Sequence, residues 1–177
     1  VLMPLLGFIL ILMVLNAVLN GDFLRGLQFL FSPDFTQVSP QTFLSAMGQA
    51  FFSLSLGMGA IMTYGAYMSD DQKILNTSIT VGGLDTLVAL MAGLAIFPII
   101  FASGLEVYSG GVGLVFITLS QTFETMFLGQ IFGPLFFILL VIASLSSSIS
   151  LLEPSVAYFS EKNIITRKSA AFIFGFL

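Results

Sequence analysis

Long apolar segments alternate with short polar stretches along this chain, which is the pattern of a membrane protein. A helix needs about 20 apolar residues to cross the ~30 Å hydrocarbon core of a bilayer. We predict four such helices and the beginning of a fifth, separated by two longer loops. The predicted spans are residues 1–18, 41–69, 74–101, 131–158 and 169–177, and the predicted loops are residues 19–40 and 102–130.

The second span is interrupted in its middle by the segment Ser53-Leu54-Ser55-Leu56-Gly57-Met58-Gly59. Each glycine lowers helix propensity by roughly 1 kcal/mol relative to alanine, so the helix is expected to break here. Unwound backbone survives inside a membrane only where it lines a cavity or contacts a ligand, because lipid cannot satisfy its amides and carbonyls. The segment therefore predicts a discontinuous helix and a candidate binding site.

The composition supports a membrane protein and excludes several classes of function. Hydrophobic residues make up 57% of the chain, charged residues 8%, and the mean hydropathy is +1.07. The chain has neither cysteine nor histidine, which argues against thiol or imidazole catalysis and against the usual zinc sites. It also lacks a cluster of basic residues, so we expect neither an enzyme nor a nucleic-acid-binding protein.

The few basic residues predict how the chain is oriented in the membrane. Lys73 follows the second span, three more basic residues follow the fourth span, and only Arg25 lies on the opposite side. Cytoplasmic loops carry an excess of lysine and arginine. We therefore place both long loops outside the cell and the shorter polar turns in the cytoplasm.

Asp85 is the one acid within the third span. A carboxylate at this depth costs ~2.5–3.5 kcal/mol on insertion scales, and such groups usually face a cation, a proton path or a basic partner. The span itself offers no basic partner. A cation ligand is one interpretation. The alternatives are that Asp85 lies nearer the cytoplasmic interface or stays protonated.

The fourth span carries small and hydroxyl side chains on one helical face. Ala143, Ser146, Ser147 and Ser150 share this face at helical spacing, so hydroxyls and a backbone carbonyl can converge on one point. Uncharged oxygen donors suit a monovalent ion. Serines and small residues are equally common where membrane helices simply pack together, and the residues alone leave both interpretations open.

The run from Phe51 to Tyr64, FFSLSLGMGAIMTY, closely resembles the broken sixth helix of the sodium-coupled neurotransmitter and amino-acid symporters, in the subgroup of the bacterial leucine transporter. The serine-rich face and Pro154 are similar to the eighth helix of that family. The resemblance implies an all-α membrane protein with two inverted five-helix repeats. Because the chain begins and ends within apolar runs, we expect a fragment that spans the fifth helix to the start of the ninth.

The resemblance implies two sodium sites. Ser53 and Asp85 match ligands of the first site, and Ala143, Ser146 and Ser147 match the second. Family members usually carry an asparagine at the position of Asp85. A carboxylate there would supply the negative charge that bound chloride supplies in chloride-dependent members. We therefore expect sodium dependence without chloride, with missing N-terminal helices of the same protein completing both sites.

The resemblance also assigns a substrate pocket and two gates. Phe52, Met58 and Leu151 would form the walls for the substrate side chain. The full set of expected substrate residues is Phe52, Ser53, Ser55, Gly57, Met58, Gly59, Ser147 and Leu151, and the expected gate residues are Gln49, Tyr64 and Glu161. Without the resemblance, Phe52 and Met58 would read as core residues and Glu161 as an ordinary solvated charge.

These observations together predict a multi-pass protein of the cell membrane. The expected function is sodium-coupled symport of a hydrophobic or aromatic amino acid by alternating access, with the amino acid, sodium ions and the lipid bilayer as its partners. The rival hypotheses are a non-transporting membrane receptor or subunit, and a channel, with the same fold. Sodium-dependent substrate uptake would distinguish the symporter from the receptor or subunit and from the channel.

Overall fold

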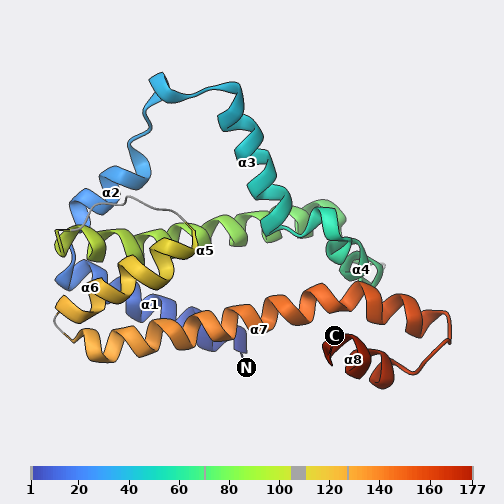
Figure 1. The fold of residues 1–177 in the computed structure, drawn as a ribbon. Coiled ribbons are helices and arrows are strands. Elements are labelled where there is room, and N and C mark those ends of the chain that lie inside the picture. The colour runs from blue at the N-terminus through green and yellow to red at the C-terminus, as the bar shows by residue number, and fades with distance from the viewer. Residues whose placement is uncertain (1, 70, 105–110, 127, 177) are drawn as a thin grey trace. The chain divides into compact units, whose positions relative to one another are not determined.

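The computed structural model describes residues 2–69, 71–104, 111–126 and 128–176, and every regular element within them is helical (Figure 1). The elements in chain order are α1 (Leu2–Asn20), α2 (Phe23–Phe31), the 3-10 turn η1 (Phe35–Gln37), α3 (Pro40–Ser53), the 3-10 turn η2 (Leu56–Met58), α4 (Ala60–Ala66), α5 (Ile74–Ala102), the π-helical turn η3 (Leu114–Thr118), α6 (Leu119–Thr125), α7 (Gly129–Glu161) and α8 (Arg167–Phe176).

Three of these helices are long and apolar enough to cross a membrane by length and composition. They comprise Met3–Asn20 of α1, all of α5 and all of α7. The second predicted span is divided instead between α3, with 14 residues, and α4, with 7 residues. Neither half alone matches the thickness of a bilayer, since a helix rises only about 1.5 Å per residue.

The first long loop contains a helix that the turn-rich sequence did not predict. Asp22 caps α2 by accepting a hydrogen bond from the Arg25 amide at 3.2 Å, and the Asp22 amide donates to the Pro98 carbonyl of α5 at 2.9 Å. The close approach requires glycine at Gly26, because a Cβ atom there would lie 2.5 Å from Cγ of Pro98. Residues 19–40 are therefore partly helical and docked, rather than an irregular aqueous loop.

The second long loop also contains helix, in η3 and α6. Its LVFIT and LSQTF segments are apolar enough to pack, and Leu119 and Phe123 are buried. This part of the predicted loop therefore packs against the protein. Residues 105–110 of that loop lie outside the described residues.

Within the single predicted transmembrane domain, the contacts gather into two compact units. The first unit comprises residues 1–36 and 86–143, and the second comprises residues 37–85 and 144–177. Helices α5 and α7 contribute residues to both. The second unit holds most of the predicted site residues. It contains α3, η2, α4, Asp85 and the C-terminal half of α7.

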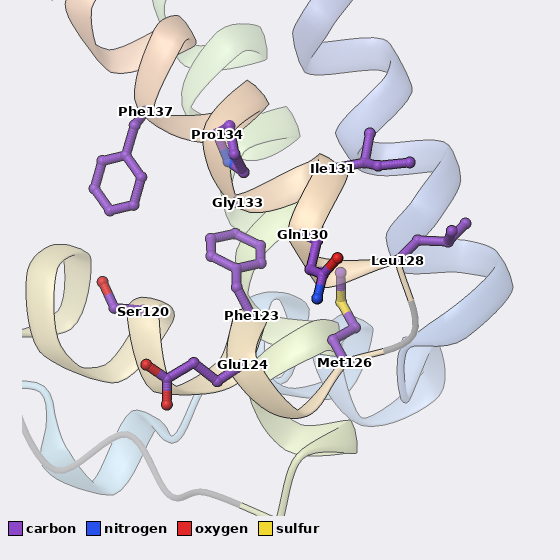
Figure 2. Close-up of a pocket in the computed structure, with 11 residues that line it drawn as sticks. Ser120, Phe123, Glu124, Met126, Leu128, Gln130, Ile131, Gly133, Pro134 and Phe137 are labelled. Atoms are coloured by element: carbon purple, nitrogen blue, oxygen red, sulfur yellow. The ribbon is translucent and has the colours of Figure 1, made fainter.

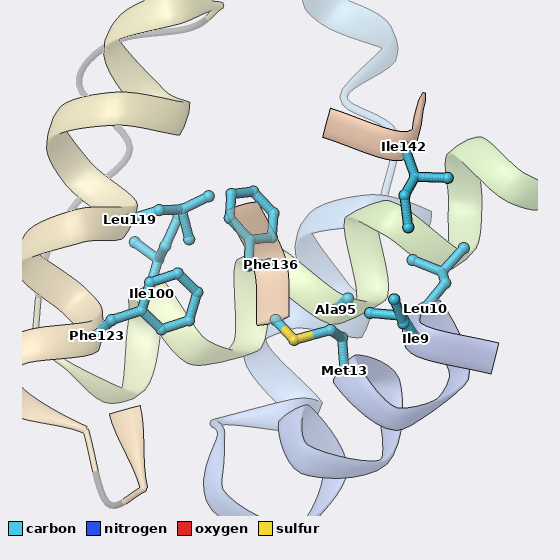
Figure 3. Packing of buried hydrophobic residues seen from close by; sticks show 9 residues of the cluster. All are labelled: Ile9, Leu10, Met13, Ala95, Ile100, Leu119, Phe123, Phe136 and Ile142. Atoms are coloured by element: carbon cyan, nitrogen blue, oxygen red, sulfur yellow. The ribbon is translucent and has the colours of Figure 1, made fainter. Parts of the chain in front are cut away.

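The first unit contains a cluster of buried apolar side chains from α1, α5, α6 and α7 (Figure 3). In a membrane, such helices are held together by close van der Waals packing, because lipid is as apolar as the side chains. The members of the cluster are Ile9, Leu10, Met13, Ala95, Ile100, Leu119, Phe123, Phe136 and Ile142.

The second unit is less tightly packed and is organised around the C-terminal half of α7. Val156 and Ala157 of α7 are buried, as is Ala170 of α8. The rings of Phe159 and Phe174 join α7 to α8, with their centroids 5.2 Å apart. This unit therefore presents α7 as the common support for α4 and α8.

Candidate cation and substrate site

The break in the second span is a bend of six residues between two helices. α3 ends at Ser53, η2 occupies Leu56–Met58, and α4 begins at Ala60. Ser55 has φ 53° and ψ 31°, and Gly59 has φ 74° and ψ −1°, both in the left-handed region. An L-residue in that region costs roughly 1–2 kcal/mol, and such strain is typical of functional sites. The structure thus confirms the discontinuous helix.

The two glycines of the break have different roles. Gly59 adopts a positive φ, whereas Gly57 is not among the residues with a positive φ, and a Cβ atom at Gly57 would meet nothing within 4 Å. The backbone conformation therefore depends on Ser55 and Gly59. The sequence argument attributed the break to both glycines and did not identify Ser55.

This difference makes a testable pair of substitutions. We expect Gly59→Ala to destabilise the complete protein by about 1–2 kcal/mol, because alanine is disfavoured in the left-handed region. Gly57→Ala places its methyl group in open space and should change the stability by less than about 0.5 kcal/mol. Thermal unfolding of the two purified variants measures both. Equal losses of stability would show that Gly59 has no special backbone role.

Ser53 and Asp85 meet at the end of α3. The Ser53 hydroxyl donates a hydrogen bond to Oδ2 of Asp85 at 2.6 Å, although the residues are 32 positions apart and Asp85 lies on α5. The end of a helix also presents carbonyl groups without intrahelical partners and a partial negative charge. Unwound carbonyls and the C-terminal ends of half-helices coordinate cations in membrane proteins with broken helices, and here a carboxylate and a hydroxyl lie at such an end.

The serine face of α7 lies on the helix as the spacing predicts. Ala143 and Ser146 are half-buried and Ser147 is exposed. On another face of the same helix, the Ser148 hydroxyl donates to the Ser144 carbonyl at 2.8 Å. The pair Ser144 and Ser148 therefore faces a different direction from the pair Ser146 and Ser147. Substitutions at Ser144 and Ser148 can serve as controls for substitutions on the serine face.

Two tyrosines fasten α4 to α7. The Tyr64 hydroxyl donates to Oγ of Ser150 at 3.2 Å, and the Tyr67 hydroxyl donates to Oε1 of Glu153 at 3.0 Å. Tyr64 was expected to be a gate residue. Ser150 and Glu153 were not assigned roles. The presence of a carboxylate within the predicted span 131–158 was the signal that could have identified Glu153, by the argument used for Asp85.

Arg167 completes this network from the start of α8. Its guanidinium group pairs with the Glu153 carboxylate, donates to the Tyr67 hydroxyl at 3.4 Å, and lies 5.7 Å from the centre of the Tyr67 ring. Hydrogen bonding to Tyr67 and the charge of Glu153 raise the pKa of Arg167, so it remains charged. The pair links α7 and α8 across 14 residues of sequence.

We expect Arg167→Gln to weaken this connection measurably but modestly. The guanidinium group is exposed, and exposed ion pairs contribute little to stability because solvent screens them. The variant should therefore unfold at a slightly lower temperature, and the difference should shrink at high salt. Lys168→Gln removes the neighbouring positive charge and is the control. A larger effect of Lys168→Gln than of Arg167→Gln would contradict the assignment.

The side chains expected to contact substrate are exposed within the described part of the chain. The exposed fraction is 71% for Phe52, 45% for Met58 and 45% for Leu151. They do not form a packed core with the described residues. Gln49 on α3 and Glu161 at the end of α7 are exposed as well.

A cavity of about 760 Å³ lies between α6 and the start of α7 in the first unit (Figure 2). Its lining is mainly apolar, with Phe123, Pro134 and Phe137 among the walls and Glu124 and Gln130 as polar members. None of the predicted sodium, substrate or gate residues is among its described lining residues. It is therefore a feature separate from the helix break.

Fold and site together define a class of protein: an all-helical, multi-pass membrane protein with a discontinuous helix that carries polar groups at its break. A family model described as the sodium:neurotransmitter symporter family matches residues 1–176. The chain belongs to this family of sodium-coupled transporters, which are not enzymes. The resemblance seen in the sequence is thereby confirmed.

Individual relatives agree with the family. The chain is 37% identical over 169 residues to an uncharacterized sodium-dependent transporter of Haemophilus influenzae, covering 96% of this chain and 37% of the relative. It is 34% identical to the uncharacterized sodium-dependent transporter YhdH of Bacillus subtilis, covering 100% of this chain and 39% of that protein. The chain thus spans less than half the length of these relatives.

A solved structure shares the fold. The crystal structure of MhsT in complex with L-phenylalanine matches with a TM-score of 0.81 and 50% sequence identity, covering 98% of this chain and 40% of MhsT. The all-α fold predicted from the sequence is therefore confirmed as that of a symporter of this family.

Proposed function

We propose that the complete protein carries a hydrophobic or aromatic amino acid into the cell together with sodium ions. The hydrogen bond between Ser53 and Asp85 at the end of α3 carries this proposal, because it brings a hydroxyl and an intramembrane carboxylate to the break in the helix. An acid within a span needs a charge partner. Sodium is the partner that both the donor set and the family favour.

The proposed substrate class is supported by the exposed apolar side chains and by a similar solved structure. Phe52, Met58 and Leu151 offer apolar contact area, and the flexible thioether of Met58 suits side chains of different shape. MhsT, which shares half of its aligned residues with this chain, was solved with L-phenylalanine bound. Carbonyls at the end of α3 would accept hydrogen bonds from the ammonium group of the amino acid. Ser53, Ser55, Ser147, Gly57 and Gly59 complete the proposed pocket.

Transport would be independent of chloride and would proceed by alternating access. Asp85 supplies a fixed negative charge beside the first sodium ion, so a chloride ion is not required there. The hinge is the strained bend between α3 and α4, whose left-handed residues can absorb a change of backbone direction. Gln49 would close the outer side of the site, and Tyr64 and Glu161 the inner side.

A second sodium ion would bind on the serine face of α7, at the Ala143 carbonyl and the hydroxyls of Ser146 and Ser147. We expect the double substitution of Ser146 and Ser147 by alanine to raise the sodium concentration for half-maximal uptake by at least about tenfold, because two oxygen ligands of the ion are lost. The double substitution of Ser144 and Ser148 by alanine is the matched control, and it should leave the sodium concentration for half-maximal uptake nearly unchanged. Equal effects would indicate a packing role instead.

Uptake of labelled phenylalanine by the full-length protein in liposomes tests the function itself. A sodium gradient directed inward should drive saturable accumulation, and the same gradient of potassium should not. Binding of the amino acid without uptake would favour a receptor or subunit. Ion conductance without saturable uptake would favour a channel.

A further inference from the structure

The contacts between α4 and α7 have a regular geometry. Tyr64 lies on α4, and Tyr67 caps the end of α4 three positions later. Their partners Ser150 and Glu153 are also three residues apart, on α7. Residues three apart lie on the same face of a helix. One face of α4 is therefore attached along one face of α7 by two successive hydroxyl bonds.

The Tyr64 bond lies next to the proposed second sodium site. Ser150 follows Ser146 by four residues and Ser147 by three, so its hydroxyl lies on the same face one turn further along α7. Tyr64 lies about one turn after the beginning of α4 at Ala60, directly after the strained break. The Tyr64–Ser150 hydrogen bond thus connects the serine face of α7 to α4, the second half of the broken helix.

We propose that the Tyr64–Ser150 hydrogen bond couples sodium at the second site to the position of α4. This inference rests on the proposed function. A cation held by the Ser146 and Ser147 hydroxyls fixes this turn of α7 and with it the Ser150 hydroxyl that receives the Tyr64 bond. Because coupling is reciprocal, an α4 that is held in place favours sodium binding to the same degree. Tyr64 is then a positioning residue, which acts through Ser150 without touching the ion.

The second bond, between Tyr67 and Glu153, has a different role in this scheme. Glu153 is already held by Arg167 of α8, and its carboxylate lies two turns away from Ser146. Removing the Tyr67 hydroxyl should therefore weaken the contact between α4 and α7. It should raise the sodium concentration for half-maximal binding less than removal of the Tyr64 hydroxyl does. This difference separates coupling from a general loss of contact between the two helices.

The experiment measures how labelled phenylalanine binding to the full-length protein depends on sodium concentration. We expect Tyr64→Phe and Ser150→Ala each to raise the sodium concentration for half-maximal binding by about threefold to tenfold, which corresponds to one hydrogen bond. The double variant should show no further increase. Ser150→Thr, which keeps a hydroxyl, should restore the sodium response.

Tyr158→Phe is the matched control, because it removes a tyrosine hydroxyl from α7, where the ring lies beneath the Lys162 ammonium group. Its sodium response should equal that of the wild type. If Tyr64→Phe fails to fold, Ser150→Ala tests the same bond from the other side. Wild-type sodium responses in both single variants, or additive effects in the double variant, would overturn the coupling alone. Phenylalanine binding by the wild type that does not depend on the sodium concentration would overturn the proposed function as well.

Discussion

Replacing Asp85 with asparagine is expected to shift sodium-driven amino-acid uptake by the complete protein to much higher sodium concentrations in the absence of chloride. Asparagine has the shape of aspartate and can still accept the Ser53 hydrogen bond, so the substitution removes the charge alone. Two opposite charges about 4 Å apart attract by roughly 4 kcal/mol at the effective dielectric of a partly solvated site. The sodium affinity should therefore fall at least about 100-fold, as measured by the sodium dependence of uptake.

Asp71 provides the control for this experiment. It lies on the exposed turn between α4 and α5, where a hydrogen bond with the Ser69 side chain lowers its pKa and keeps it ionised. Asp71→Asn removes one negative charge from the chain outside the site and should leave uptake unchanged. Addition of chloride should partly restore uptake to the Asp85→Asn variant. Normal chloride-free uptake by that variant would contradict the role of the carboxylate.

Replacing Gly129 with alanine is expected to produce the largest loss of stability. Between α6 and α7, the Gly129 amide donates to the Met126 carbonyl at 3.0 Å and Leu128 has φ 60°. A Cβ atom on Gly129 would lie 1.8 Å from the Phe123 carbonyl oxygen, so the backbone would have to move. Overpacking of this kind costs about 3 kcal/mol or more, which thermal unfolding of the purified protein would detect.

Gly133 is the matched position one turn further along α7. A Cβ atom there would lie 3.4 Å from Cβ of Phe123, which is close to ordinary contact. Gly133→Ala should therefore change the stability by less than about 1 kcal/mol, since alanine also favours the helix. Comparable stability of the two alanine variants would show that the turn before α7 does not require glycine.

The membrane spans and the broken helix were predictable because lipid imposes simple rules on a chain. A span must be long and apolar, and a break within it must be satisfied by protein or ligand. The predicted break and the observed bend coincide at Ser53 to Gly59. Helix α2 was missed because Asn20-Gly21-Asp22 resembles a turn. Asp22 in fact caps a helix whose position depends on contact with Pro98, which the local sequence does not encode.

The site was predictable only in part. Asp85 was conspicuous as an acid in an apolar span, but its proximity to Ser53 came from the resemblance, because no local pattern relates residues that are 32 positions apart. The contacts of Tyr64 and Tyr67 with α7 could not be predicted, since they depend on how two helices dock. Ser55 was expected among the substrate residues, but its left-handed backbone conformation was not predicted, because a serine in that region has no compositional signal.

Equilibrium binding of labelled phenylalanine to the purified full-length protein, measured while sodium replaces choline at constant ionic strength, tests the central claim most directly. We predict that binding rises steeply and cooperatively with sodium, without chloride, and that Asp85→Asn shifts the curve to much higher sodium. Binding that is equally tight in choline and sodium, with no shift in the variant, would contradict the account.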